Sequence, residues 1–379
     1  IVAFLDDLFL EELRESPQSM TYLGMRERYD EWNDISDTAR NKNLDMTKQH
    51  LAKVMAIDLF NANASVKLSV EMFIQQANQQ IKGDQWRYHS YPVSQMRGVH
   101  SMIPSFLINQ HLIADKEEAQ AYIKRITNSA TLLEQVVEQL EIRQQKGIVA
   151  PKFVFPLVMA SIDNILKGAP FRQGPDSNIF ADFKAKVAKL KLSEADKNDL
   201  TLAASVALQD SLAPGYQNLL SVLRKLETEA TNDHGVWKFP NGEAFYNFAL
   251  QRTTTTDLTA EQIHTKGLYE VDRIQVEMLE IMQAVGFEGD LQEFFDFMRN
   301  DPRFYFPDTP EGKQAYLDQA TQLINDMNAR LDELFITKPK ADLVVKAVEP
   351  FREASAGQAF YQRPAPDGSR PGTYFANLY

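Results

Sequence analysis

The sequence predicts a mostly α-helical protein with two lobes and a minor β element near the C-terminus. Long segments carry apolar residues at spacings of three and four, which is typical of helices with one buried face. Alternation typical of strands is confined to two short stretches, GQAFYQRP (357–364) and GTYFANLY (372–379). The chain has 379 residues, of which 44% are hydrophobic, so it is long enough to bury a substantial core.

The first helix is predicted at the start of the chain, in the stretch IVAFLDDLFLEELRESP. Its acidic residues Asp6, Asp7, Glu11 and Glu12 make it amphipathic and differ from the basic start of a secretory signal peptide. Further helices of moderate length are predicted from their apolar spacing, at 38–62, 65–82, 96–110, 176–190, 194–210 and 216–231.

The longest predicted helix spans 115–146. Asp115 and Glu118 are placed to cap its first turn, and Gly147 supplies a C-terminal stop. One face should be buried, because apolar residues recur along it at helical spacing, at Ala119, Tyr122, Ile126, Leu133, Val137 and Leu140.

Two more long helices are predicted in the second half of the chain. One spans 259–285, with Thr259 and Gln262 as a capping box and a stop at Gly286. The other begins at Thr309, has Pro310 in its first turn and continues to Leu334.

Loops rich in Gly, Pro, Asn and Asp are predicted at 167–178, 231–242 and 364–372. The second loop is the best boundary between lobes. We therefore expect a helical N-terminal lobe at 1–234 and a second helical lobe at 235–379 that ends in a strand.

Charge and composition restrict the classes of partner. The chain has 40 basic and 52 acidic residues, a formal net charge of −12, which disfavours nucleic acid and anionic membranes as partners. No stretch reaches the roughly 18 apolar residues of a membrane helix. Cysteine is absent, so disulfides, thiolate nucleophiles and cysteine metal sites are excluded.

The histidines do not form a recognisable metal motif. None of the six is followed by glutamate, so the zinc helix HExxH does not occur in this sequence. We predict no metal ligand and no catalytic residue within the chain. His264 follows Glu261 by three residues but lies in line with Val271, Met278 and Val285, so we predict a buried histidine near a helix start.

Aromatic residues suggest two weaker hypotheses. His89 and His100 flank an aromatic-rich stretch that could form a ligand wall, although an irregular connection packed by its own aromatics is the favoured interpretation. The tryptophans Trp32, Trp86 and Trp237, with abundant carboxylates, are the only support for a glycosidase.

Several stretches together identify a family resemblance. They are SPQSMTYLGMRERYDEWNDIS (16–36), YPVSQMRGVHSMIPSFL (91–107), AQAYIKRI (119–126), AFYNFALQRTTTTDLTAEQIHTKGLYEVDRIQVEMLEIMQAVGF (244–287) and SRPGTYFANLY (369–379). They resemble the bacterial family known as domain of unknown function 885. That family in turn resembles helical zinc metallopeptidases of the gluzincin type, and many members carry lipoprotein export signals.

The resemblance implies a catalytic part beyond this chain. In the family, a segment similar to RPGTYFANLY leads into a helix with an HE…GHH motif, so zinc is expected in a longer parent chain and not here. The implied molecule is the scaffold and substrate cleft of a zinc-peptidase-like protein, inactive as this chain. A periplasmic or lipid-anchored location is implied, with any lipid anchor in the precursor; a cytoplasmic location stays open.

The resemblance also implies a site for a peptide-like substrate. Gly372 to Tyr379 would be the strand edge that binds an extended peptide, with Tyr374 and Asn377 as substrate contacts. Arg370 would meet either a substrate carboxylate or a neighbouring acid. The alternatives are a purely structural strand and, for the whole chain, a non-catalytic helical lipoprotein that binds a peptide or glycan.

Overall fold

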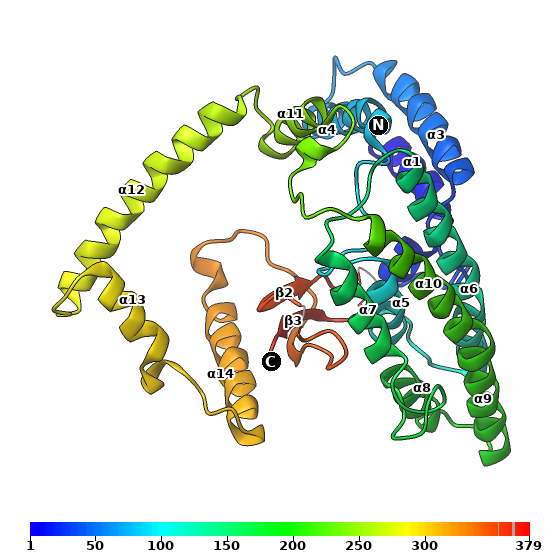
Figure 1. Ribbon diagram of the computed structural model, residues 1–379. Helices are drawn as coiled ribbons and strands as arrows, with labels where there is room; N and C mark the ends of the chain where they lie inside the picture. The colour runs from blue at the N-terminus through cyan, green and yellow to red at the C-terminus, as the bar shows by residue number, and fades with distance from the viewer. Residues whose placement is uncertain (355, 366–367) are drawn as a thin grey trace.

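In the computed structural model, the chain forms a main helical body, an arch of further helices beside it, and a small sheet between the two (Figure 1). The structure describes residues 1–354, 356–365 and 368–379. Among these residues, no helix is both long and apolar enough to cross a membrane.

The first four helices form one end of the main body; they are α1 (Val2–Arg14), α2 (Pro17–Tyr22), α3 (Asp37–Met55) and α4 (Ala64–Gly83). A small apolar cluster of Leu8, Val54 and Val70 joins α1, α3 and α4. His50 of α3 is buried and its two ring nitrogens lie 2.9 and 3.0 Å from carboxylate oxygens of Glu11 and Glu12. The acidic face of α1 therefore fixes that helix to α3.

The main core is built around α6, and its helices are α5 (Val99–Asn109), α6 (Lys116–Gln145), α7 (Val154–Ile165), α8 (Asn178–Ala188), α9 (Glu194–Ala207) and α10 (Ala213–Glu229). A π-helical turn, Leu208–Leu212, joins α9 to α10. The predicted buried face of α6 is confirmed: Tyr122, Ile126 and Leu133 are fully buried. Removing this apolar surface from water stabilises the bundle by roughly 25 cal/mol per Å².

The capping residues act as predicted. An Asp115 carboxylate oxygen accepts from the backbone N–H of Glu118 at 2.8 Å, and Gly147 takes the left-handed conformation (φ 73°) that ends α6. Thr259 and Gln262 form the capping box of α12 (Ala260–Ala284). These ends are set by local chemistry, which is why the sequence predicts them.

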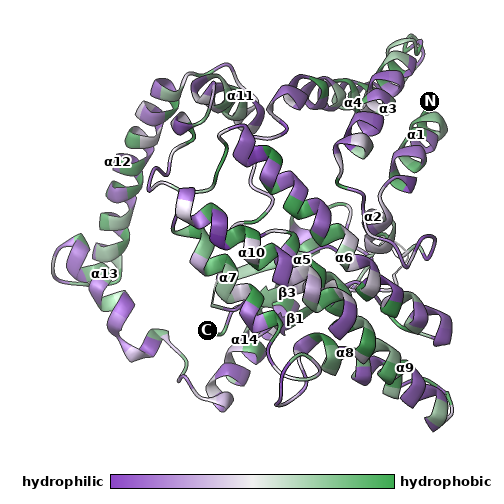
Figure 2. Ribbon diagram, turned by 45° about the vertical axis from the view of Figure 1, so that its right-hand side comes forward, coloured by the Kyte–Doolittle hydropathy of each residue, from purple (hydrophilic) through white to green (hydrophobic). Residues whose placement is uncertain are grey.

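The arch consists of α11 (Gly242–Thr254), α12, α13 (Leu291–Asn300) and α14 (Pro310–Asn328), and α14 returns to the sheet (Figure 1). The prediction that His264 is buried is wrong, because its stripe mostly faces solvent: His264 is exposed, Val271 and Val285 are 51% and 64% exposed, and Met278 is half-buried. Hydrophobic residues recur along α12 although it stands away from the main core (Figure 2).

Several helix boundaries differ from the prediction. The helix from Thr309 ends at Asn328 and not at Leu334, which is 77% exposed, and α3 ends at Met55 and not at residue 62. The sequence interpretation also missed four helices, namely α2, α7, α11 and α13. Two of them contain a proline near the start, Pro17 in α2 and Pro156 in α7, which weakens the sequence signal of a helix.

The sheet has three strands, β1 (Leu343–Ala347), β2 (Ala359–Gln362) and β3 (Gly372–Ala376), in the order β1-β3-β2. β3 pairs with β1 in parallel and with β2 antiparallel. The two predicted strands are confirmed and β1 was missed. The prediction that Gly372–Tyr379 forms a free edge is wrong, because β3 is the central strand. The predicted loop at 364–372 includes 366–367, which lie outside the described residues.

The C-terminal segment packs on the N-terminal helices. Phe351 belongs to the main core, and a guanidinium nitrogen of Arg370 donates to the carbonyl of Tyr22 at 3.0 Å. The division into lobes at 234/235 stays a prediction.

Candidate ligand-binding cleft

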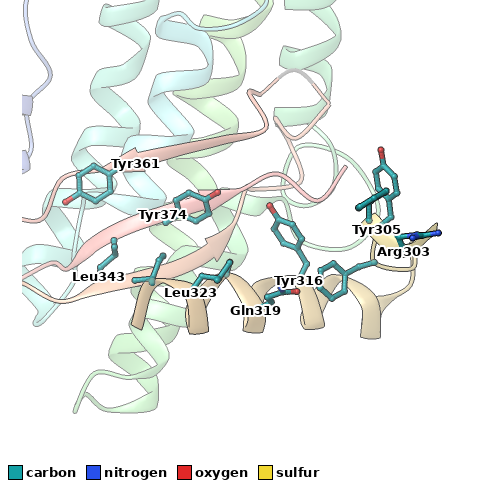
Figure 3. A pocket seen from close by; sticks show the side chains of 12 residues that line it. Arg303, Tyr305, Tyr316, Gln319, Leu323, Leu343, Tyr361 and Tyr374 are labelled. Atoms are coloured by element: carbon teal, nitrogen blue, oxygen red, sulfur yellow. The ribbon is translucent and has the colours of Figure 1, made fainter. Parts of the chain in front are cut away.

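A cleft of about 660 Å³ lies between α14, one face of the sheet and the turn at Pro302–Phe304 (Figure 3). We call it the tyrosine cleft, after Tyr305, Tyr316, Tyr361 and Tyr374, which line it together with Arg303, Phe304, Phe306, Gln319, Ala320, Leu323, Ile324 and Leu343. Its volume lies within the range of small-molecule pockets in proteins.

The sheet forms the floor of the cleft because alternate residues of a strand point to opposite faces. Tyr361 of β2 is directly opposite Tyr374 of β3, so both side chains lie on the face that lines the cleft. On the other face, the rings of Phe360 and Phe375 stack with centroids 4.9 Å apart, and Phe375 is buried. One face is thus used for packing and the other remains open to a ligand.

Helix α14 forms the opposite wall. Tyr316, Gln319 and Leu323 follow each other at helical spacing and project toward the sheet (Figure 3). The Thr309 hydroxyl accepts from the N–H of Gly312 at 3.1 Å and caps the helix. A Cβ at Gly312 would lie 2.0 Å from the carbonyl oxygen of Pro307, so glycine permits the close turn that sets the angle of α14.

The polar groups of the cleft suit binding. Burial and the neighbouring Tyr316 phenol raise the pKa of Tyr374, so its hydroxyl is neutral and can donate a hydrogen bond at physiological pH. Arg303 forms a salt bridge with Asp301 at 3.0 Å, and its guanidinium lies 5.0 Å from the centre of the Phe297 ring. The cleft therefore offers aromatic faces, hydroxyls and the Gln319 amide.

Of the three predicted substrate contacts, only Tyr374 lines the cleft. The Asn377 amide donates to the carbonyls of Glu353 and Ala356 at 2.7 and 3.2 Å. Arg370 is 6% exposed and bonds to the carbonyl of Tyr22. The structure does not bring these three side chains together; their part in substrate binding stays a prediction.

The other lining residues were not predicted as site residues. The apolar spacing in 309–334 marks the wall of α14, and the stretch GQAFYQRP contains Tyr361. No sequence pattern indicated Tyr305 as a site residue, because its position depends on the turn between α13 and α14.

No group of three His, Cys, Asp or Glu side chains that could hold a metal occurs in the part of the chain that the structure describes. Two of the histidines, His100 and His111, are buried inside the helical body. Burial lowers the pKa of His100 to about 4. Burial and the adjacent Arg125 hold the pKa of His111 well below its ordinary value.

The residues considered above for an aromatic ligand wall and for a glycosidase do not line the tyrosine cleft. The Trp32 indole is buried and donates to the carbonyl of Arg125 at 2.8 Å, whereas Trp237 is 69% exposed. His89 lies 3.0 Å from the Pro240 carbonyl oxygen and packs edge-on against Trp86. Trp86, His89 and Tyr91 also contact the rings of Phe239 and Phe245, so this connection packs against a distant segment as well as on its own aromatics.

Two solved structures share the fold. One, described as "the putative lipoprotein from Colwellia psychrerythraea", has a TM-score of 0.86 at 22% identity and covers 98% of this chain. Another, "a putative lipoprotein of unknown function from Shewanella oneidensis", has a TM-score of 0.55 at 16% identity and covers 99% of this chain. This chain spans only 66% and 63% of the length of those two chains.

Among curated proteins, none matches the chain. The family model described as "Bacterial protein of unknown function (DUF885)" matches residues 17–379, nearly the whole sequence. The chain therefore belongs to the DUF885 family of bacterial proteins.

Proposed function

We propose that this chain supplies the substrate-binding scaffold of an exported, zinc-peptidase-like protein, and that the tyrosine cleft binds an extended peptide. The observation that carries the proposal is the cleft itself, an aromatic hollow along one face of a three-stranded sheet. Aromatic side chains bind peptide side chains well because they are large, rigid and partly polar.

The sheet offers a second means of holding a peptide. Within the described residues β1 and β2 are the outer strands, so each leaves one edge of backbone N–H and C=O groups without a strand partner. A peptide that added to either edge would gain main-chain hydrogen bonds while its side chains entered the cleft. This replaces β3 as the strand that receives the peptide.

In this proposal, the zinc ion and its catalytic chemistry belong to a longer parent chain. The described residues do not fit a zinc ion, because no three metal-ligating side chains converge. This chain alone would therefore bind substrate without cleaving it. Export, with a periplasmic or lipid-anchored location, rests on the lipoprotein descriptions of the two structural relatives.

The same cleft supports a second candidate, a lipoprotein that binds a peptide or glycan without chemistry. Its four tyrosines could also stack on sugar rings. The two ligand classes differ in the contacts they make, since only a peptide forms main-chain hydrogen bonds with the edge of the sheet.

The test is binding of fluorescent peptides and neutral oligosaccharides to the 379-residue chain, followed by anisotropy. We expect a library of unstructured peptides to contain binders, and Tyr305→Ala and Tyr361→Ala each to weaken them about tenfold, the equivalent of about 1.4 kcal/mol. Both tyrosines are 57% exposed, so their removal should leave the fold intact.

Tyr269→Ala is the matched control, because Tyr269 is a 66% exposed tyrosine on α12, outside the cleft. We expect it to leave peptide affinity unchanged. If the unaltered chain binds oligosaccharides and no peptide, and both cleft variants lose the oligosaccharide binding, the glycan-binding candidate is correct. Peptide binding that neither variant weakens would exclude the tyrosine cleft as the site.

A further inference from the structure

A second cavity, of about 480 Å³, lies far along the chain from the tyrosine cleft, between α3, α4 and the turn Asp84–Trp86. It is lined by three arginines, Arg40, Arg87 and Arg252, and by amide side chains that include Asn43 and Gln79. Arg252 and Gln79 also line an adjoining hollow of about 330 Å³ against α11. We call the two together the arginine groove.

Contacts between α4 and α11 hold the groove in shape. Lys82 donates to the side-chain oxygen of Gln251 at 3.1 Å, and Gln251 donates to Asp257 at 2.8 Å. A Cβ at Gly83 would lie 3.0 Å from the ring of Phe248, so the two helices approach closely there. Arg252 of α11 is thereby fixed in the same cavity as residues of α3 and α4.

The charge of the groove is opposite to that of the protein. The chain carries a net charge of −12, yet the larger cavity is lined by three arginines and one acid, Asp84. Arg87 forms a salt bridge with Asp84. Across the described chain, no ion pair within 4.0 Å is formed by Arg40 or Arg252. Two guanidinium groups thus remain available to an anion.

Two acids in the neighbourhood of these arginines, Asp37 and Asp257, accept hydrogen bonds from other side chains. Asp37 is close enough to Arg40 for its pKa to be affected, but it accepts hydrogen bonds from Tyr88 and Gln139. Asp257, beside Arg252 in the adjoining hollow, accepts from Gln251. Among the described residues, neither carboxylate forms an ion pair with Arg40 or Arg252, so both guanidinium groups keep hydrogen-bond donors for a ligand.

The amide side chains of the groove indicate that the ligand also carries hydrogen-bond donors. The side-chain oxygen of Asn43 is buried without a hydrogen-bond partner among the described residues. An unpaired buried acceptor is uncommon and calls for a donor. A hydroxyl placed beside Asn43 would supply one, and the Gln76 and Gln79 amides offer both donors and acceptors to neighbouring hydroxyls.

We propose that the arginine groove binds a small anionic ligand rich in hydroxyl groups, such as a sugar acid or sugar phosphate. Its acid group is held by Arg40 and Arg252, and its hydroxyls are held by Asn43 and the glutamine amides. Carboxylate and phosphate share this chemistry, because both accept paired hydrogen bonds from a guanidinium. The groove is separate from the tyrosine cleft and gives the protein a second ligand.

The test is calorimetric titration of the complete 379-residue chain with D-glucuronate, glucose 6-phosphate, glucose and inorganic phosphate. We expect both sugar anions to bind more tightly than glucose or inorganic phosphate, and the tighter of the two identifies the acid group. Equal binding of glucose would overturn the anionic requirement. Equal binding of inorganic phosphate would overturn the hydroxyl requirement, and no binding by either sugar anion would overturn the proposal.

Variants locate the binding. The double variant Arg40→Gln with Arg252→Gln should weaken the sugar anion about tenfold or more, since it removes two charge-assisted contacts. Arg299→Gln is the matched control, an exposed arginine on α13 that should leave the affinity unchanged. An unchanged affinity in the double variant would exclude the groove.

A further variant separates binding from folding. Asn43→Leu removes the unpaired buried acceptor, so we expect it to weaken the sugar anion severalfold without lowering the melting temperature. A fall in melting temperature with unchanged affinity would assign Asn43 a structural role and contradict the proposed hydroxyl contact.

Discussion

Arg125→Ala is expected to lower the free energy of unfolding by about 4 kcal/mol, the sum of lost hydrogen bonds and a cavity. Arg125 is fully buried on α6 and donates to the Glu31 carbonyl at 3.0 Å, to His111 Nδ1 at 3.0 Å and to the Thr21 hydroxyl at 2.8 Å. Its guanidinium also lies 4.8 Å from the centre of the Phe106 ring. Denaturant unfolding of the variant measures the loss.

Burial lowers the pKa of Arg125 to about 10, so the side chain stays charged at neutral pH. Its removal would leave three acceptors without a donor in the centre of the main core. The control is Lys124→Ala on the same helix, whose 3.2 Å salt bridge with Asp30 is exposed and should change stability by less than about 0.5 kcal/mol. Similar stabilities for the two variants would contradict a structural role for Arg125.

Acid is expected to destabilise the protein through His100 and His111, whose pKa values are lowered by burial. The pKa of His100 is lowered to about 4 by burial, below the ordinary value of 6.5 that applies in the unfolded chain. Below pH 6.5 the unfolded chain therefore binds more protons, and stability is lost as the pH falls toward about 4. Between pH 7 and pH 5, His100 alone should lower the free energy of unfolding by about 2 kcal/mol.

His111 changes stability in the same direction, because burial and Arg125 lower its pKa too. The measurement is denaturant unfolding at pH 7 and pH 5 for the natural protein and for His100→Leu. The variant should lose about 2 kcal/mol less over this range, since leucine does not titrate. Equal pH dependence in both proteins would show that His100 binds a proton equally well in both states.

The sequence predicted helices best where local chemistry defines them. Asp115 and Gly147 bound α6, and Thr259 with Gln262 begins α12, because capping needs only residues a few positions apart. The helix α7 was missed, since its apolar run contains Pro156 and its start carries no side-chain cap. A side-chain cap is likewise absent from α11, which begins after Asn241 in the left-handed conformation.

The candidate site was predictable only in part. Tyr374 lies in a stretch that reads as a strand, so its place on a sheet could be expected. That Tyr361 lies opposite it depends on strand register, which is a long-range pairing. The third strand, β1, was missed, and with it the fact that β3 is central and has no free edge.

By itself, the sequence determined the helical class, the family, the net charge and the ends of the longest helices, because these depend on composition and on contacts between near neighbours. Only the tertiary structure decided that the stripe on α12 mostly faces solvent, that Arg370 and Asn377 bond to backbone carbonyls, and that Arg40 and Arg252 share one groove. Each of these depends on where distant segments meet. Local spacing fixes which face of a helix is apolar, but the packing of other elements decides whether that face is covered.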